Sequence, residues 1–363
     1  MKIAEIVVIG GGPAGLMATL AAVEMGAKVT LIERSSRLGG QLIKQTHMFF
    51  GSEKEYASTR GIDIGKILAT EVLENPNVEV MLDCTALSYF PDDGVLGVEV
   101  EEEAFTKIKA DRIIVATGAS EKLLPFENND LPGIYGAGAV QTLMNEQGVV
   151  PGDSVLMVGA GNIGLIVSYQ LMQAGVKVKA IIDAAPRIGG YLVHASKVAR
   201  LGIPILTSHS IKAAHADKRT GSLSRAVIWE FDDNWQPVPG SEKVINCDVM
   251  CISVGLSPLT ELLWQAGCDM KFISSLGGHV PTRNKNMETS VSGIYVAGDV
   301  AGVEEASSAM IEGRLAGLNA AKSLGYDNGT YNEKKEEALE QLESLRSGPV
   351  GEKIREGLAK LVS

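Results

Sequence analysis

Two glycine-rich turns, each followed by a well-placed carboxylate, carry the chemistry that this sequence predicts. In the first turn, Gly10, Gly12 and Gly15 stand between an apolar run and an Ala/Leu-rich helical stretch. Glycines with this spacing let the backbone approach a pyrophosphate at the start of a helix. Glu33 ends the next apolar run, residues 28–32, where a carboxylate can accept hydrogen bonds from a ribose hydroxyl. The pattern predicts a strand–turn–helix unit that binds a dinucleotide.

A second turn repeats this pattern near the middle of the chain. An apolar run over residues 154–158 leads into further glycines, and Asp183 ends the apolar run that follows. Both halves then continue to an apolar strand that ends at a glycine, Gly118 in the first half and Gly255 in the second. This internal repeat predicts two dinucleotide-binding domains more strongly than either turn alone. The residues expected at the second nucleotide are Gly159, Gly161, Asn162, Ile163, Gly164, Asp183 and Gly255.

The composition indicates a globular protein, and the net charge argues against one class of partner, nucleic acid. The 363 residues are 45% hydrophobic and 21% charged, as in a folded chain with several cores. The net charge of −11 argues against nucleic acid, because phosphate binding requires a basic surface. Met1 and Lys2 lead directly into the first apolar run, so we expect no cleavable signal. No apolar run reaches the roughly 18–20 residues of a membrane span. We therefore expect a cytoplasmic protein.

The cysteines and histidines show no spacing typical of a metal site, so we predict none. No two cysteines form a CxxC motif, and we interpret all of them as buried, reduced thiols, with a redox or metal role as the alternative. Four of the five histidines are expected to be structural or surface groups. These cysteines and histidines are Cys84, Cys247, Cys251, Cys268, His194, His209, His215 and His279.

Hydrophobic periodicity and turn residues predict the other elements. They are helices over residues 62–75, 137–147 and 193–201, antiparallel strands over 79–83, 86–90 and 95–101, a strand over 203–206, a hairpin-like region over 226–242, and two amphipathic tail helices around 332–345 and 352–361.

A third motif, Gly298-Asp299, follows the second repeat. Together with the first turn and the segment 116–118, it resembles the two-dinucleotide-domain flavoproteins, the superfamily of pyridine nucleotide–disulfide oxidoreductases. The resemblance implies that the first turn binds FAD and that Asp299 binds the ribityl chain. A helix starting near residue 304 would point its positive end at the flavin. The residues that the resemblance assigns to FAD are Gly10, Gly12, Pro13, Ala14, Gly15, Glu33, Arg34, Gly40, Gln41, Ala116, Thr117, Gly118, Gly298, Asp299, Ala306 and Ser307.

The same resemblance leaves the second turn for a nicotinamide dinucleotide. Asp183 favours NAD(H) over NADP, because a carboxylate repels a 2′-phosphate, although Arg187 lies only four residues further on. The alternative is a vestigial domain that keeps the fold. The implied fold class is α/β, with two Rossmann-like three-layer ββα dinucleotide-binding domains, the second inserted in the first, plus a short helical C-terminal tail. The implied domains are 1–119 with 258–330 for FAD, 120–257 for NAD(H) or another nucleotide, and 331–363 for the tail.

The sequence departs from this superfamily at the redox-active cysteines. Relatives carry a cysteine pair soon after the second strand or a CxxC near the second domain, but residues 38–47 and 136–143 contain no cysteine. Disulfide reduction needs a thiolate and a resolving thiol, so the sequence argues against it. Residues 116–141 and 311–318 resemble instead the alpha-type subunits of heteromeric amine and imino-acid dehydrogenases: opine oxidase, hydrogen cyanide synthase B, dye-linked proline dehydrogenase and sarcosine oxidase.

This resemblance implies an FAD-dependent oxidoreductase, the NAD(H)- or electron-transfer subunit of an amine or imino-acid dehydrogenase complex. It would act on a small-molecule substrate, in an oligomer, beside a second flavoprotein subunit or an electron-carrier protein. Several such relatives carry a cysteine-rich iron–sulfur module that is not in this sequence, so electrons would leave through NAD, a partner subunit or a separate carrier. One alternative is a stand-alone NADH-dependent flavin reductase or oxidase that passes electrons to oxygen, a quinone or a carrier. Another is a nucleotide-binding scaffold subunit.

His47 is the one candidate catalytic residue. With Lys44 and Thr46 it lies in the segment that the resemblance brings past the flavin, where it could donate a proton. The alternative is a hydrogen-bonded loop residue. The amphipathic tail likewise has two interpretations, as helices that cover their own domain or as a contact with another subunit.

Overall fold

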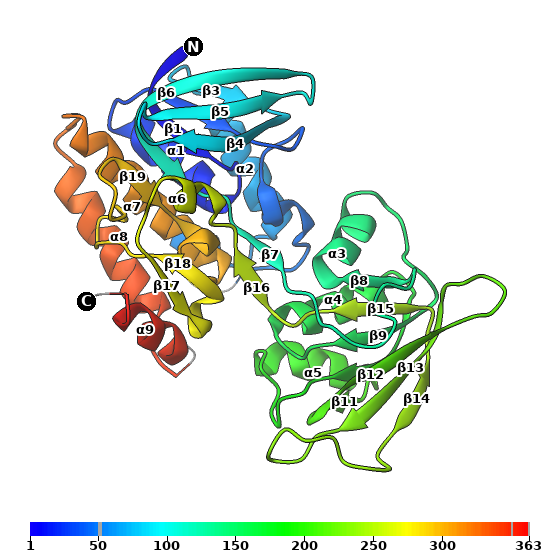
Figure 1. Ribbon diagram of the computed structural model, residues 1–363. Coiled ribbons are helices and arrows are strands. Elements are labelled where there is room, and N and C mark those ends of the chain that lie inside the picture. The colour runs from blue at the N-terminus through cyan, green and yellow to red at the C-terminus, as the bar shows by residue number, and fades with distance from the viewer. Residues whose placement is uncertain (50–52, 350, 362–363) are drawn as a thin grey trace. The chain divides into compact units, whose positions relative to one another are not determined.

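The computed structural model describes residues 1–49, 53–349 and 351–361, and the chain forms two compact units (Figure 1). Unit 1 combines Met1–Ser120 with Leu256–Ser363, and unit 2 consists of Glu121–Gly255. The predicted fold class is confirmed, because one Rossmann-like unit is inserted in another. The tail helices group with unit 1. The connecting strands β7 (Ala119–Glu121) and β16 (Leu256–Pro258) pair with each other.

The sheet of unit 1 joins segments from both ends of the chain. Its strands lie in the order β3-β2-β1-β6-β5-β4, and β19 pairs with β6 as well. The parallel part consists of β1 (Lys2–Ile9), β2 (Val29–Ile32), β3 (Val78–Met81), β6 (Ala104–Val115) and β19 (Ile294–Val296), while β4 (Cys84–Phe90) and β5 (Val95–Val100) extend it in the antiparallel sense.

One strand direction differs from the sequence prediction. Residues 79–83 were expected in an antiparallel meander, but β3 runs parallel to β2, with Val78 beside Val29. The physical reason is the connection between them, which contains α2 (Gly61–Leu73). A crossover through a helix returns the chain in the same direction and therefore produces a parallel pair. The antiparallel meander begins only at β4.

The helices of unit 1 pack closely because glycines stand where they cross. A Cβ atom on Gly313 of α7 (Ala306–Ser323) would collide with the carbonyl oxygen of Ala14 of α1 (Pro13–Glu24), and Gly317 has the same relation to Ala18. The tail helix α8 (Tyr331–Leu345) buries Ala338 and Leu342 in the same core. The shorter elements of unit 1 are η1 (Gly40–Lys44), η2 (Glu53–Glu55), α6 (Glu261–Gln265), β17 (Met270–Ile273), η3 (Ser274–Leu276), β18 (Gly278–Pro281), η4 (Gly298–Val300) and α9 (Glu352–Ala359).

Unit 2 has three layers, and the side chains of one strand, which point alternately to its two faces, show this. In β9 (Ser154–Val158), Val155 and Met157 belong to one hydrophobic cluster, while Leu156 and Val158 belong to another. Helices cover the first face and a second sheet covers the other, as a doubly covered parallel strand requires. The parallel sheet has the order β11-β10-β9-β15-β8, and the second sheet has the order β12-β13-β14. The other elements are β8 (Ile134–Gly136), α3 (Ala137–Asn145), α4 (Asn162–Gln173), β10 (Lys177–Ile182), α5 (Leu192–Arg200), β11 (Ile205–Leu206), β12 (His209–Ala216), β13 (Leu223–Glu230), β14 (Lys243–Asn246) and β15 (Val249–Ile252).

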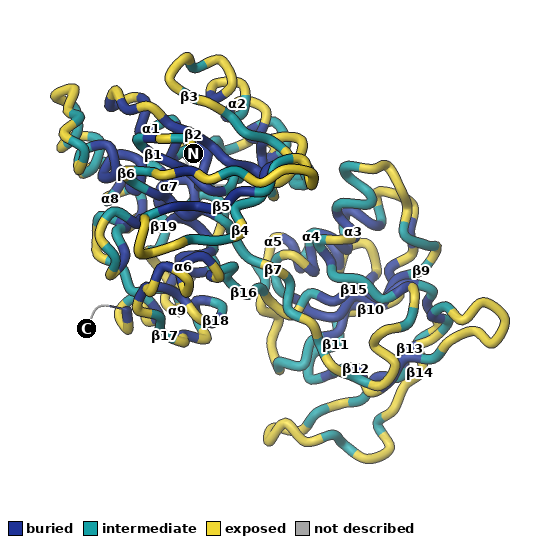
Figure 2. Tube along the Cα trace, turned by 45° about the horizontal axis from the view of Figure 1, so that its top comes forward, coloured by how far each residue is buried: buried dark blue, intermediate teal, exposed yellow. Residues whose placement is uncertain are grey.

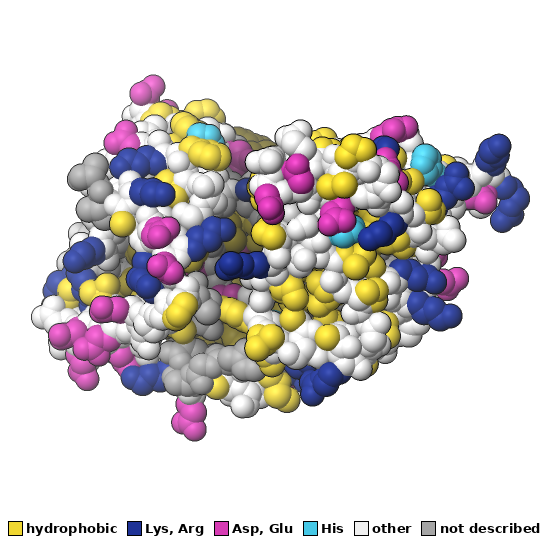
Figure 3. All heavy atoms as spheres, turned by 90° about the horizontal axis from the view of Figure 1, so that it is seen from below, with side chains coloured by type: hydrophobic (Ala, Val, Ile, Leu, Met, Phe, Trp, Pro, Cys, Tyr) yellow, Lys and Arg dark blue, Asp and Glu magenta, His cyan; other side chains and the backbone are white. Residues whose placement is uncertain are grey.

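Burial follows the central strands. All four residues of β2 are buried, and so is β1 from Ile6 to Ile9, as the dark trace of β1 in Figure 2 shows. The face in Figure 3 carries Lys and Arg side chains interspersed with Asp and Glu. Within the described residues, no helix is both long and apolar enough to cross a membrane.

Candidate nucleotide-binding sites

The candidate site of unit 1 lies at the carboxyl ends of four parallel strands. Ile9 is level with Ile32 and with Val115, and Val115 is level with Val296. The segments that follow these residues therefore emerge at one edge of the sheet. They carry the first glycine turn, Glu33, the 116–118 segment and the Gly298-Asp299 motif. Ligands of open parallel α/β sheets bind at this edge.

Several of the predicted glycines are required by the packing of the protein itself, without any ligand. A Cβ atom on Gly10 would collide with the Ala116 carbonyl oxygen, and one on Gly15 would collide with the Gly10 carbonyl oxygen. A Cβ atom on Gly298 would lie 2.8 Å from the Cβ of Ala14. The strand end, the helix start and the 298–299 motif are therefore in direct contact.

Gly12 is different, and this difference tests whether a cofactor fits. A Cβ atom on Gly12 would meet only Gly40 Cα, at 3.8 Å, and its φ of −80° suits any residue. In unit 2, Gly161 has a φ of −75° and nothing within 4 Å. Each of these glycines begins a helix, where free N–H groups and the helix dipole attract phosphate. Packing does not require either glycine, which agrees with the prediction that a pyrophosphate lies against the backbone there.

Glu33 is fixed by two backbone groups. Its carboxylate accepts hydrogen bonds from Gly11 N at 2.7 Å and Ser35 N at 2.8 Å, and it is 8% exposed. A carboxylate has about four acceptor positions, so both oxygens can still accept from a ribose. Arg34 and Gln41, which were also predicted to bind FAD, are exposed.

Two further segments close around this edge. A Cβ atom on Gly40 would lie 2.6 Å from Gly12 Cα, so this predicted residue does reach the turn. The Thr117 hydroxyl donates to the Leu259 carbonyl at 2.7 Å, and Leu259 N donates to Gly118 O at 3.0 Å. Thr117 thus links its loop to the segment around Leu259. The residues next to Thr117 in the sequence do not predict this contact. Ala306 and Ser307 form the first turn of α7.

Asp299 is held in an environment that disfavours its charge. It accepts a hydrogen bond from Glu304 N at 3.3 Å. Burial raises the pKa of Asp299 to about 7; that hydrogen bond opposes the rise, and the carboxylates of Glu312, Glu304 and Glu305 reinforce it. A carboxyl group with this pKa changes protonation near neutral pH.

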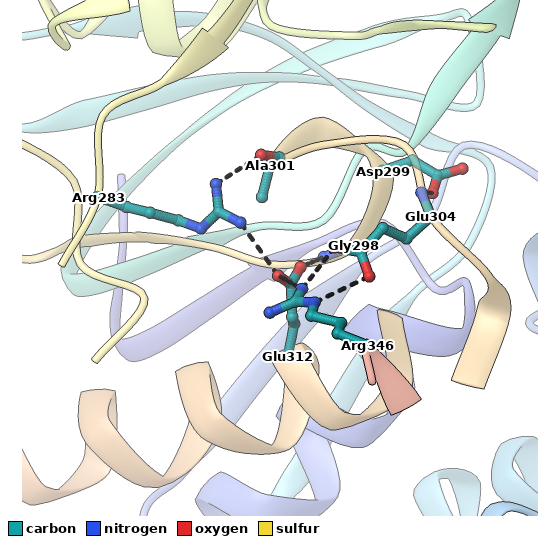
Figure 4. A network of polar contacts seen from close by, with 7 residues as sticks. All are labelled: Arg283, Gly298, Asp299, Ala301, Glu304, Glu312 and Arg346. Atoms are coloured by element: carbon teal, nitrogen blue, oxygen red, sulfur yellow. Dashed lines mark hydrogen bonds and ion pairs between the residues drawn. The ribbon is translucent and has the colours of Figure 1, made fainter. Parts of the chain in front are cut away.

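A buried ion-pair network surrounds the 298–299 motif (Figure 4). Glu312 of α7 accepts a hydrogen bond from Gly298 N at 3.0 Å and pairs with Arg283 at 3.1 Å and Arg346 at 2.7 Å. Arg346 also pairs with Glu304 at 2.5 Å. Sequence reasoning did not identify these residues, because their partners are up to 42 positions away.

Unit 2 reproduces the cradle of unit 1. The carboxylate of Asp183 accepts from Ala160 N at 2.7 Å and from Ala185 N at 2.8 Å, as Glu33 does at the equivalent positions. A Cβ atom on Gly164 would collide with Gly159 O, as one on Gly15 would with Gly10 O. The predicted repeat is therefore visible in individual hydrogen bonds.

The repeat extends to a loop that sequence reasoning missed. Gly39 N donates to Gly11 O at 2.8 Å, and Gly190 N donates to Ala160 O at 2.9 Å. The sequence signal is Arg-Leu-Gly-Gly at 37–40 and Arg-Ile-Gly-Gly at 187–190, with the donor at the third residue of the first copy and the fourth of the second.

The other predicted residues of unit 2 divide into two kinds. The Asn162 side chain accepts a hydrogen bond from Tyr191 N at 2.8 Å, so it fastens the loop over the start of α4. Ile163 and Gly255 are exposed. Their contact with a nucleotide stays a prediction.

His47 lies between η1 and η2 and is half-buried. Its ring stacks on Phe49 at a centroid distance of 6.0 Å, and its carbonyl accepts from Gly61 N at 3.3 Å. These contacts fix a loop, and a catalytic role for His47 stays a prediction.

The four cysteines are buried and unbonded to one another. Burial raises the pKa of Cys247 to about 11 and that of Cys251 further still. A thiol in such a place is a poor nucleophile. No group of three or more His, Cys, Asp or Glu suited to a metal ion occurs in the part of the chain that the structure describes.

Comparison with known proteins identifies the family. Residues 4–313 match the pyridine nucleotide-disulphide oxidoreductase family, so the chain belongs to it. Members bind FAD and a pyridine nucleotide, and this chain is an FAD-dependent oxidoreductase of that family. The expected cofactors are thus confirmed at the level of the family.

Individual relatives confirm the predicted subgroup. An opine oxidase subunit of Agrobacterium tumefaciens (strain Ach5) is 30% identical over 338 residues, which cover 88% of this chain and 66% of that protein. The alpha subunit of sarcosine oxidase from Corynebacterium sp. (strain P-1) is 26% identical over 331 residues, which cover 89% of this chain and 33% of that protein. The chain therefore spans about two thirds of one relative and one third of the other.

A solved structure agrees in fold. L-proline dehydrogenase from P. horikoshii superposes with a TM-score of 0.70 at 24% sequence identity, covering 92% of this chain and 59% of that chain.

Gly15, which packing requires, and Gly12, which packing does not require, lead to opposite predictions. Gly12→Ala should leave the unfolding temperature of the flavin-free protein nearly unchanged and weaken FAD binding at least about tenfold, because the methyl group occupies phosphate space. Gly15→Ala should destabilise unit 1 by about 1–3 kcal/mol, because the backbone must move. Calorimetry and titration of flavin-free protein with FAD measure both effects. Equal loss of stability in the two variants would contradict this assignment.

Asp299→Asn should stabilise the flavin-free protein in a pH-dependent way. The folded-state pKa of Asp299 is raised, so its contribution to stability is full below pH 3.8 and is lost as pH rises through about 7. The variant lacks this loss. Its unfolding free energy should exceed that of the wild type by on the order of 1 kcal/mol at pH 8.5, after allowance for partial solvent screening, and by less at pH 5.5.

The measurement for Asp299 is thermal unfolding of both proteins at the two pH values. FAD affinity should fall in the same variant, because an amide replaces an acceptor. A stability difference that is the same at both pH values would show that Asp299 does not titrate in this range.

Proposed function

We infer that this chain is the electron-transfer flavoprotein subunit of an amine or imino-acid dehydrogenase complex, with FAD in unit 1 and NAD(H) in unit 2. The observation that carries the proposal is the duplicated cradle, in which Asp183 repeats the hydrogen bonds of Glu33. The buried cysteines offer no dithiol to receive electrons. The opine oxidase and sarcosine oxidase chains that this chain resembles are by name subunits of oxidases.

The residues of the two cradles bind and orient, and the redox chemistry is the cofactor's. FAD accepts two electrons from a donor and returns them to an acceptor. In this proposal Gly12 and Gly161 leave room for the pyrophosphates, and Glu33 and Asp183 accept from the riboses. Asp299 faces the ribityl chain. Oxidation of the amine takes place in the partner subunit, so substrate specificity resides there.

The choice of NAD(H) follows from charge. In this proposal the two backbone hydrogen bonds hold the Asp183 carboxylate next to the ribose 2′-hydroxyl, which donates to it. A 2′-phosphate there would meet a carboxylate at short range, which is repulsive. Arg187, four residues after Asp183, is exposed. It is the first residue of the loop repeat 187–190, as Arg37 is of the repeat 37–40 in unit 1.

The same cradle favours a second candidate, a stand-alone NADH-dependent flavin reductase or oxidase. Both candidates need NAD(H) in unit 2. They differ only in the protein or small molecule that exchanges electrons with the flavin. A scaffold subunit without turnover would need neither cofactor to react.

Anaerobic mixing with NADH should bleach the visible flavin absorbance of the wild-type protein. Asp183→Ala should raise the NADH concentration for half-maximal bleaching at least about tenfold, because a hydrogen bond from ribose to a charged group is lost. Asp248→Asn is the matched control. Asp248 accepts three hydrogen bonds from residues 153 and 154 at the opposite end of β9. If both variants shift equally, or if NADH never bleaches the flavin, the NAD(H) assignment is wrong.

Affinity purification of the tagged chain from its own host tests the subunit role. A second flavin-containing polypeptide should copurify, and only the mixture should reduce an electron-accepting dye with an amine as donor. An isolated chain that oxidises amines at the full rate of the complex would contradict the subunit role. A chain that reduces oxygen or a quinone with NADH and brings no partner would indicate the stand-alone enzyme, and one without flavin would indicate the scaffold.

A further inference from the structure

We propose that Arg346, which lies in the C-terminal tail, is a positioning residue for the flavin. It fixes both ends of the loop 298–304 that presents Asp299. The proposal rests on FAD binding in unit 1. It concerns a residue beyond the part of the chain that matches the family, which ends at residue 313.

The geometry connects Arg346 to Asp299 by two short routes (Figure 4). In the first, Arg346 Nε and Nη2 donate to the two oxygens of Glu304, at 2.9 and 2.5 Å, and Glu304 N donates to Asp299 at 3.3 Å. In the second, Arg346 Nη2 donates to Glu312 at 2.7 Å, and Glu312 accepts from Gly298 N at 3.0 Å. One guanidinium therefore holds the loop before and after Asp299.

The charges around the loop balance only when Arg346 is present. Arg283 and Arg346 face Glu304 and Glu312, and all four side chains are 12% exposed or less. Without Arg346, Glu304 would lose its arginine partner and Glu312 would keep only Arg283, beside Asp299. Removing one member of a buried ion-pair network leaves an uncompensated charge, which is strongly unfavourable. The loop would relieve this repulsion by moving Glu304 outward, and Glu304 N would move with it.

Other contacts keep the tail in place without touching the loop. Glu337 of α8 pairs with Arg314 of α7 at 3.3 Å and with Lys54 of η2 at 2.6 Å. In α9, Leu358 packs with a cluster that contains Leu276. These contacts should hold the tail on unit 1 when Arg346 is replaced, so the effect of Arg346 on the loop can be measured separately.

The experiment compares FAD affinity in Arg346→Met and Arg314→Met, both in the full chain. Each substitution removes an arginine that links the tail to α7, but only Arg346 contacts the loop. We expect the FAD dissociation constant to rise at least about tenfold in Arg346→Met and less than about twofold in Arg314→Met. The visible circular dichroism of the bound flavin should change only in Arg346→Met. Equal affinities in the two variants would overturn the proposal.

Two further variants separate positioning from general stability. Arg346→Lys keeps the charge but cannot hold both oxygens of Glu304, so its affinity should fall between those of the wild type and Arg346→Met. Glu304→Gln combined with Arg346→Met should lose little more affinity than Arg346→Met alone, because the contact that Glu304 makes with Arg346 is already lost in Arg346→Met. Leu358→Ala weakens tail packing alone. If it lowers FAD affinity as much as Arg346→Met does, the tail acts by packing and the proposal fails.

The wild-type protein separates this inference from the proposed function. If it binds no FAD, the proposed function fails. If it binds FAD, and Arg346→Met or Arg346→Lys binds FAD equally well, only the role of Arg346 fails.

Discussion

Unit 1 depends on the close approach of backbone to backbone where α1 begins. Gly15 rests on the carbonyl of Gly10, while Gly313 and Gly317 of α7 rest on the carbonyls of Ala14 and Ala18. Any side chain at these positions would separate the helices from each other or from the end of β1. Because Gly313 meets Ala14 and Gly317 meets Ala18, α7 lies directly against α1 over its first two turns and fixes the start of α1 in place. Packing therefore depends on Gly10 and Gly15, whereas Gly12 of the same turn is left free of packing contacts for the proposed phosphate.

The two cradles share their hydrogen bonds but differ in what stands beside them. Gly11 is crowded by Leu38, which would lie 2.5 Å from an added Cβ atom, whereas unit 2 has Ala160 at that position. In unit 1, β19 adds a strand next to β6 and brings Asp299 to the edge. In unit 2 the equivalent neighbour of β15 is β8, which comes from earlier in the chain. Unit 1 thus has an additional acceptor for a ligand that extends beyond its pyrophosphate, as the ribityl chain of FAD does.

The sequence predicts those parts of the site whose residues lie close together along the chain. A glycine turn after an apolar run, with an acid at the end of the next strand, identifies a cradle within about thirty residues. The Arg346–Glu304–Glu312 network was not predictable in this way, because Glu304 and Glu312 lie 42 and 34 positions from Arg346 and no local pattern pairs them. The direction of β3 was missed because short strands look alike in either direction, and only the connecting helix decides. The loop repeat at 37–40 and 187–190 is also a local signal, because both copies stand in the sequence.

The pairing of β6 with the late strand β19 has a consequence for folding during synthesis on the ribosome. β6 needs β19 as a neighbour, and α1 needs α7, but these partners are synthesised only after unit 2. Unit 2 is a single continuous stretch and can complete its fold while unit 1 still lacks a strand and a helix. During that interval the apolar edge of β6 and one face of α1 remain uncovered, which is the condition that recruits chaperones. We expect a nascent chain that has left the ribosome through residue 255 but not through residue 294 to hold a finished nucleotide-binding domain attached to an unfinished flavin-binding one.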